Sequence, residues 1–143
     1  MGKYKNPKIC DEKNLRAISD RLNNVDIVCG DYRESENFID KNTFVYFDPP
    51  YRPLNETSSF TSYAEGMFND KNQEELAEYV ARINNVGAKV VVSNSDPKNV
   101  DKNDNFFDDI YSSQKIKRIT AKRMINCNGE RRGRVSELLI SNY

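Results

Sequence analysis

Apolar residues recur at helical spacing in two segments of the chain. In residues 11–22, Leu15, Ile18 and Leu22 lie about one turn apart behind Asp11, a residue type suited to cap a helix. The second segment begins at Asp70 and carries the stripe Leu76, Tyr79, Val80 and Ile83. Both patterns predict amphipathic helices. Residues 34–40 are also compatible with a helix.

Short runs of β-branched and aromatic residues predict strands at residues 25–29, 43–47 and 88–92. The run at 43–47 has no polar alternation, which is typical of a strand buried on both faces. Residues 110–119 and 135–140 are strand-like and are joined by a basic connection, as in an antiparallel hairpin. The order of elements predicts an open α/β sheet, with parallel strands and helices, that ends in this hairpin.

Length and composition fit one folded domain, residues 1–143. Hydrophobic residues make up 37% of the chain and charged residues 31%, a balance near that of globular proteins. We find no internal repeat, low-complexity stretch or long linker. The formal net charge is zero, so any site for nucleic acid must be a local basic patch.

Several kinds of chemistry are excluded by what the chain lacks. There is no histidine, which removes Ser-His and Cys-His nucleophile pairs and imidazole metal ligands. The three cysteines lie far apart and form no pair of the metal-binding or redox kind. No apolar run has the length of a membrane span, and the start has no signal-like stretch. We therefore expect a reduced, cytoplasmic protein without a metal site.

Asp48-Pro49-Pro50-Tyr51 directly follows the predicted strand at residues 43–47. The carboxyl ends of parallel strands are where open α/β sheets bind ligands. The two prolines fix their own backbone angles, and Pro49 also restrains Asp48. The motif can thus hold a carboxylate, a carbonyl and an aromatic ring rigidly, although Pro-Pro alone is also common in turns.

The strand followed by Asp-Pro-Pro-Tyr resembles motif IV of amino-methyltransferases, and the wider match resembles the Dam-like adenine-N6 DNA methyltransferases. The start, Gly2 to Pro7, is similar to a stretch at which the DNA-recognition region of that family begins. The other matching segments cover nearly the whole chain in the family's order: residues 30–32, 44–54, 60–63, 91–95 and 137–143.

The resemblance implies a partial Rossmann-like fold that uses S-adenosylmethionine to methylate adenine N6 in duplex DNA, with GATC as the family's habitual site. It implies a flipped adenine whose amine is held by the Asp48 carboxylate and the Pro49 carbonyl, with Tyr51 stacked on the base. Pro50 completes the catalytic motif. The cofactor's methionine end would lie near Asp48 and its adenosine near Asp31, although Gly-Asp after a strand is also ordinary turn chemistry.

Candidate contacts to DNA lie outside the motif. Phe60 and Tyr63 would help to hold the target base, or else pack locally. The segment 115–134 holds eight basic residues and one acid, and it would face DNA phosphates if the first hairpin strand runs parallel to the sheet. A solvated hairpin tip is the alternative. The basic candidates are Lys3, Lys5, Lys122, Arg123, Arg131 and Arg132.

The chain departs from the family at its cofactor site. A complete member carries a Phe-x-Gly-x-Gly loop on its first strand and an acidic residue after its second, and neither is present. We therefore expect residues 1–24 to be the tail of a DNA-recognition region with a helix, and residues 25–143 to be the catalytic α/β portion. The sequence therefore leaves open whether this chain is active alone. The missing strands would leave apolar faces and strand edges exposed, which favours a homo-oligomer.

Two other functions fit the sequence. One is an amino-methyltransferase that acts on RNA or on a protein amide, because the motif suits several planar amines. The other is a non-catalytic nucleic-acid-binding module, in which the basic hairpin binds phosphates and the motif is vestigial. Salt-dependent DNA binding that survives Asp48→Ala, without methyl transfer, would favour the module.

Overall fold

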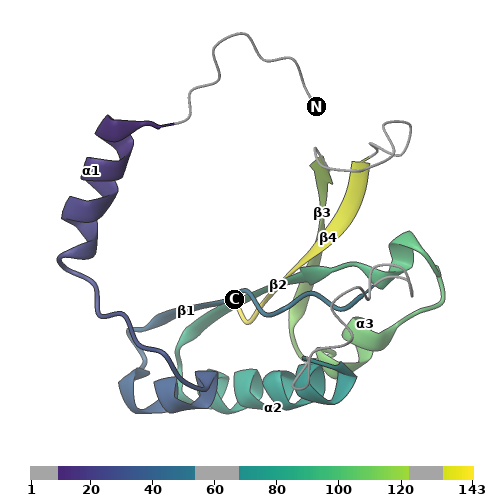
Figure 1. The fold of residues 1–143 in the computed structure, drawn as a ribbon. Coiled ribbons are helices and arrows are strands. Elements are labelled where there is room, and N and C mark those ends of the chain that lie inside the picture. The colour runs from purple at the N-terminus through teal and green to yellow at the C-terminus, as the bar shows by residue number, and fades with distance from the viewer. Residues whose placement is uncertain (1–9, 54–67, 123–133) are drawn as a thin grey trace, which may run out of the picture. The chain divides into compact units, whose positions relative to one another are not determined.

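A computed structural model of the protein describes residues 10–53, 68–122 and 134–143, and the chain divides into two units, Met1–Glu34 and Ser35–Tyr143 (Figure 1). The first unit contains helix α1, Glu12–Leu22, which confirms the first predicted helix. The Asp11 carboxylate caps it by accepting a hydrogen bond from the Asn14 amide at 3.2 Å. None of the residues of α1 is buried.

The strand predicted at residues 25–29 is wrong. Residues 23–31 form a turn and irregular chain, and Val25, Ile27 and Val28 are exposed. A strand needs a neighbour for its backbone hydrogen bonds, and no described strand pairs with this run. A 3-10 helix, Tyr32–Phe38, then takes the place of the helix expected at 34–40.

A mixed four-stranded sheet forms the centre of the second unit, in the order β1-β2-β4-β3. Strands β1, Phe44–Phe47, and β2, Lys89–Ser95, are parallel. Strand β4, Arg134–Ser141, is antiparallel to both β2 and β3, Lys115–Lys122. The predicted α/β class, with parallel strands and a terminal antiparallel hairpin, is confirmed. The hairpin begins later than expected, because a short helix, α3 (Phe106–Ile110), and a turn occupy residues 106–114.

Helix α2, Asp70–Val86, follows the prediction and lies against one face of the sheet (Figure 1). Asn69 and Asn72 form a reciprocal capping box at its start, and Gly87 ends it with a φ of 92°, a conformation that favours glycine. Its stripe of apolar residues packs on the sheet to form the core. The buried core residues include Leu76, Tyr79, Val80, Ile83, Val90, Val92, Leu138 and Ile140.

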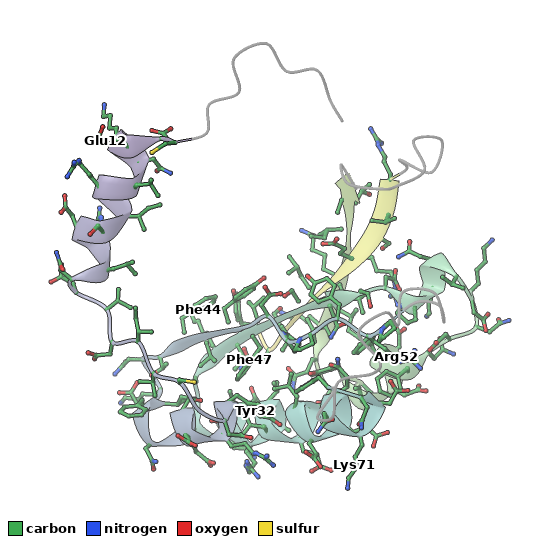
Figure 2. The ribbon with its side chains drawn as sticks, viewed as in Figure 1. Glu12, Tyr32, Phe44, Phe47, Arg52 and Lys71 are labelled. Carbon is green, nitrogen blue, oxygen red and sulfur yellow. The ribbon has the colours of Figure 1, made fainter. Side chains whose placement is uncertain are left out.

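The prediction that β1 is buried on both faces is also wrong. Phe47 points toward α2 and meets the Tyr79 ring edge-on, with ring centroids 6.0 Å apart. Phe44 and Tyr46 point to the opposite face and are 58% and 54% exposed, and Figure 2 shows Phe44 and Phe47 on opposite sides of the strand. Within the described sheet β1 has β2 as its sole neighbour, so the expected exposure of apolar residues beside a free strand edge is observed.

Candidate active site

The Asp-Pro-Pro-Tyr turn leaves the sheet at the carboxyl end of β1, beside the last residues of β2. Phe47 pairs with Val92, so Asp48 comes level with Ser93. β2 continues through Ser93, Asn94 and Ser95, three polar residues beyond the predicted apolar run. All three are buried; Ser93 contacts Asp48 in the turn, and the other two contact Arg52, which directly follows it. The turn is therefore supported by polar side chains at the carboxyl end of β2, the strand parallel to β1.

Asp48 has one carboxylate oxygen engaged and one available. The Ser93 hydroxyl donates a hydrogen bond to Oδ1 of Asp48 at 2.7 Å and lies 3.3 Å from the Phe47 carbonyl oxygen. Among the described residues no donor contacts Oδ2, and the side chain is exposed to solvent. Asp48 is thus oriented by Ser93 and still able to accept a hydrogen bond from a ligand.

A chain of buried amides fixes the backbone of the turn. Gln73 of α2 donates to the Pro50 carbonyl oxygen at 3.0 Å, and its own Oε1 accepts from Asn94 Nδ2 at 3.0 Å. The Asn94 Oδ1 in turn accepts from the Arg52 amide at 3.1 Å. Ser95 closes the set by donating to the Arg52 carbonyl at 2.7 Å. Satisfied hydrogen-bond networks of this kind hold one backbone geometry.

The Pro49 carbonyl differs from its neighbour. The Pro50 carbonyl oxygen accepts a hydrogen bond from Gln73, whereas no donor in the described part of the chain reaches the Pro49 carbonyl oxygen. The site therefore presents two hydrogen-bond acceptors, the Asp48 carboxylate and the Pro49 carbonyl, on a rigid turn. A planar amine, which carries two N–H donors, is the ligand that such a pair suits.

Tyr51 is the aromatic component of the site. Its side chain is 40% exposed, so part of the ring is open to a ligand. Burial of the remainder raises the pKa of the Tyr51 hydroxyl; the Ser93 hydroxyl opposes this, and the nearby acidic groups of Glu137 and Asp48 reinforce it. Tyr51 is therefore a neutral ring at physiological pH, suited to stacking rather than to proton transfer.

Asp31, the second predicted cofactor residue, lies in the first unit and not in the unit that carries Asp48. Both of its carboxylate oxygens bind the Arg33 guanidinium, at 2.8 and 2.9 Å, and Oδ1 also accepts from the Arg33 amide. The hydrogen bonds from Arg33 lower the pKa of Asp31 to about 2. Any ligand of Asp31 would have to share it with Arg33.

The basic hairpin points toward the edge that carries Asp48. Because β4 is antiparallel to both of its neighbours, β3 runs parallel to β1 and β2, which meets the condition set for a phosphate-facing tip. The pairs Thr120–Ser136 and Lys122–Arg134 continue the hairpin past the last residue of β2. The remaining DNA and base candidates lie outside the described residues: Lys3, Lys5, Phe60, Tyr63, Arg123, Arg131 and Arg132.

Arg118, another basic residue of segment 115–134, is already engaged in ion pairs within the protein. Its guanidinium binds the buried Asp96 at 3.1 Å and Asp108 at 2.7 Å. The hydrogen bond from Arg118 lowers the pKa of Asp108, and the same bond raises that of Arg118. Arg118 is therefore engaged by two carboxylates of its own unit and is not available to phosphate.

A small cavity of about 170 Å³ adjoins the turn, and its lining residues are Arg52, Pro53, Pro97, Val100, Asp101 and Asp104. Ligand pockets usually measure roughly 300–1,000 Å³, so this cavity does not by itself define a cofactor site. Across the described ranges no helix is long and apolar enough to cross a membrane. Nor does any group of three or more potential ligands there have the geometry to hold a metal ion.

Five residues of the site received no role from sequence reasoning: Arg52, Gln73, Ser93, Asn94 and Ser95. Gln73 is a buried polar residue three positions before Leu76 on the apolar stripe of α2. A glutamine at that position on such a stripe is a signal, because buried amides need partners. Arg52 belongs to the matched text, but its partners are distant in sequence.

Comparison with known proteins supports the same assignment. The model of the D12 class N6 adenine-specific DNA methyltransferase family matches residues 1–125. The type II methyltransferase M.MjaIII of Methanocaldococcus jannaschii is 51% identical over 99% of this chain and 47% of its own length. The type II methyltransferase M1.LlaDCHI of Lactococcus lactis is 35% identical over 99% of this chain and 48% of its own. A DNA adenine methylase of Haemophilus influenzae is 33% identical over 90% of this chain and 43% of its own.

The chain thus spans about half the length of the curated relatives that it matches. Within that span, the family match covers α1, the β1 turn, α2 and β2. The chain belongs to the D12 class N6 adenine-specific DNA methyltransferase family.

Proposed function

We propose that this chain forms the catalytic-turn portion of an enzyme that transfers a methyl group from S-adenosylmethionine to N6 of adenine in duplex DNA. The observation that carries the proposal is a pair of acceptors on the rigid turn that no described residue contacts, the Oδ2 atom of Asp48 and the Pro49 carbonyl oxygen. Membership of the adenine-specific family identifies the matching planar amine as that of adenine.

The turn would act by binding and orienting the base. Asp48 and Pro49 each accept one hydrogen of the adenine amine, which leaves the nitrogen lone pair directed away from the turn. Tyr51 stacks on the base, which must leave the duplex because its amine is not accessible within the stack. The hydrogen bond from Gln73 to the Pro50 carbonyl oxygen helps to fix the backbone of the turn in this geometry. When bound, S-adenosylmethionine supplies the electrophilic methyl group.

The residues present fit part of a cofactor site. The exposed Asp48 carboxylate is suited to the charged methionine end, and Asp31 to the adenosine hydroxyls, in competition with Arg33. The hairpin end at Lys122, with Arg123, Arg131 and Arg132, would contact DNA phosphates, and Lys3 and Lys5 would do so from the start of the chain. Phe60 and Tyr63 are proposed to help hold the flipped base.

Several finer features belong to the same proposal. The duplex site is GATC, the reaction takes place in the cytoplasm, and no metal takes part. The chain works as one domain, with residues 1–24 as the tail of the DNA-recognition region. The exposed edge of β1, with Phe44 and Tyr46, favours association with another polypeptide, which includes a second copy.

Transfer of a labelled methyl group to GATC duplexes tests the proposal. The assay uses this chain with and without the half of the Methanocaldococcus jannaschii relative that it does not match. We expect transfer when the half is added, and a fall of at least about 100-fold for Asp48→Ala. Glu78→Ala, on the exposed side of α2, is the matched acidic control and should transfer normally.

The opposite results would each contradict the proposal in a different way. Equal transfer by Asp48→Ala would remove Asp48 from catalysis. Transfer to RNA in preference to duplex DNA would replace the substrate. Salt-sensitive DNA binding that is unaffected by Asp48→Ala, with no transfer under any condition, would favour the non-catalytic binding module.

A further inference from the structure

Arg52, the residue after Tyr51, is held on every side. Asn94 binds its amide and Ser95 binds its carbonyl, so β2 fixes its backbone. Its guanidinium forms a two-pronged contact with Asp70, Nε to Oδ1 at 2.8 Å and Nη2 to Oδ2 at 3.0 Å. The remaining nitrogen, Nη1, donates to Asp104 at 2.7 Å. All three guanidinium nitrogens of Arg52 are therefore engaged.

The partners of Arg52 connect the turn to both neighbouring helices. Asp70 is the first residue of α2, the helix whose Gln73 holds the Pro50 carbonyl. Asp104 also accepts the Phe106 amide at 3.0 Å, at the start of α3. The Arg52 guanidinium lies 4.4 Å from the centre of the Phe106 ring. One side chain thus joins the catalytic turn, the start of α2 and the start of α3.

The electrostatics of the cluster favour a fixed arrangement. Only 22% of the Arg52 side chain is exposed, so its ion pairs are partly shielded from water. The hydrogen bonds with Asp70 and Asp104 raise the pKa of Arg52. Burial opposes the ionisation of Asp104, but the hydrogen bonds from Arg52 and the Phe106 amide, together with the charges of Arg52 and Lys98, outweigh it and lower the pKa of Asp104. Both charges therefore persist throughout the neutral range.

We propose that Arg52 is a positioning residue, which sets the orientation of Tyr51 and the Pro49 carbonyl toward the target base. The inference rests on the proposed function, because it concerns the geometry of the same site. Tyr51 lies between two anchored groups, the Pro50 carbonyl and the Arg52 amide, and the arginine fork determines the direction in which the chain leaves it. Lysine carries the same charge but cannot reproduce a two-pronged contact with a carboxylate.

Arg118 provides a matched control within the same chain. It also bridges two carboxylates, those of Asp96 and Asp108, and its side chain is 34% exposed. It differs from Arg52 in that neither carboxylate contacts the catalytic turn. Arg52→Gln and Arg118→Gln therefore each remove an arginine that bridges two carboxylates, but only Arg52 directly follows Tyr51 in the chain.

The experiment compares Arg52→Gln, Arg52→Lys and Arg118→Gln in this chain combined with the other half of the Methanocaldococcus jannaschii relative. We expect Arg52→Gln to lower kcat roughly 10- to 100-fold, because small misplacements at a reacting centre have effects of that size. The KM for S-adenosylmethionine should stay within about twofold. The fluorescence of 2-aminopurine at the target position should also fall, which reports poorer holding of the flipped base. Arg52→Lys should recover only part of both signals.

Arg118→Gln should lower the melting temperature by as much as Arg52→Gln while changing kcat by less than about twofold. Equal losses of kcat in the two glutamine variants would overturn the positioning role and leave a structural one. Full recovery by Arg52→Lys would also overturn it, because charge alone would then suffice.

Failure of the proposed function has a separate signature. If the wild-type combination transfers no methyl group, the rate of amide hydrogen exchange in this chain still tests the inference about Arg52 without any activity measurement. We expect the Arg52 amide, which Asn94 holds, to exchange at least about tenfold faster in Arg52→Gln than in Arg118→Gln. Equal exchange rates of this amide in the two variants would refute the positioning role of Arg52, whatever the reaction proves to be.

Discussion

Helices α1 and α2 have the same kind of sequence pattern and opposite surroundings. The apolar stripe of α1, Leu15, Ile18 and Leu22, is 46–55% exposed, whereas Leu76 and Ile83 of α2 are 1% and 0% exposed. Each helix begins at a side-chain cap, from Asp11 or Asn69. Periodicity and caps therefore specify a helix in both units, but they do not specify what covers its apolar face.

The difference teaches where the stability of the second unit originates. Isolated helices of 11 residues are marginal in water, and most helix stability in proteins comes from packing of the apolar face. α2 has such packing against Val90, Val92 and Ile140 of the sheet. The turn that carries Asp48 is held by that same packed layer, through Gln73.

The largest effect should come from shortening equivalent leucines in the two helices. Leu76→Ala should lower the free energy of unfolding by roughly 2–5 kcal/mol, because it leaves a cavity in the core. Leu15→Ala should change it by no more than about 0.5 kcal/mol. Urea unfolding followed by circular dichroism measures both values. Similar losses would mean that the stripe of α1 is covered in solution, and the contrast between the helices would disappear.

A smaller effect is expected from the single polar residue on the buried stripe of α2. Gln73→Leu keeps the side chain's bulk but leaves the Pro50 carbonyl and Asn94 Nδ2 without their partner, at a cost of roughly 1–3 kcal/mol. Glu74→Leu, at the exposed neighbouring position, should stay within about 0.5 kcal/mol. Urea unfolding again gives the difference. A neutral or stabilising Gln73→Leu would show that the amide bridge is dispensable.

The smallest effect concerns a titration in the first unit. Arg33→Ala should raise the pKa of Asp31 from about 2 part of the way to its ordinary value of 3.8, because the side-chain hydrogen bonds from Arg33 disappear while the amide of residue 33 still donates. Carboxyl carbon shifts followed by NMR between about pH 1 and 6 would measure it. An unchanged low pKa would show that another cation stabilises the carboxylate.

In the second unit, removal of the arginine that pairs with Asp104 should change how the free energy of unfolding depends on pH. The folded state lowers the pKa of Asp104, so the stabilisation is present above the carboxyl's ordinary pKa and is lost as the pH falls below it. Arg52→Gln should therefore reduce the acid sensitivity of unfolding.

The sequence was a reliable guide where the signal was local. The stripe of α2, the cap at Asp11 and the order of the last strands all depend on neighbouring residues, and the observed elements follow them. The run at 25–29 failed because β propensity reports a suitable surface rather than an available partner. The full length of β2 was missed because its last residues, Ser93, Asn94 and Ser95, are polar.

The part of the site that could be predicted from the sequence is the part that is contiguous along the chain. Asp48, Pro49, Pro50 and Tyr51 form a contiguous motif and could be identified as a unit. Arg52 and Asp104 are 52 residues apart, and Gln73 and Pro50 are 23 apart, so no local pattern connects them. The residues that hold the turn emerge only when the sheet and helices are assembled.

This separation along the chain has a consequence for the order of folding. The bonds from Asn94, Ser95 and Ser93 to the turn span 42, 43 and 45 residues, whereas the β3–β4 hairpin joins segments that are close in sequence. Contacts across long loops form late, because the loop entropy must be lost before they form. The catalytic turn should therefore acquire its shape among the last events of folding, and partial opening of the β1–β2 pair would abolish it while the hairpin persists.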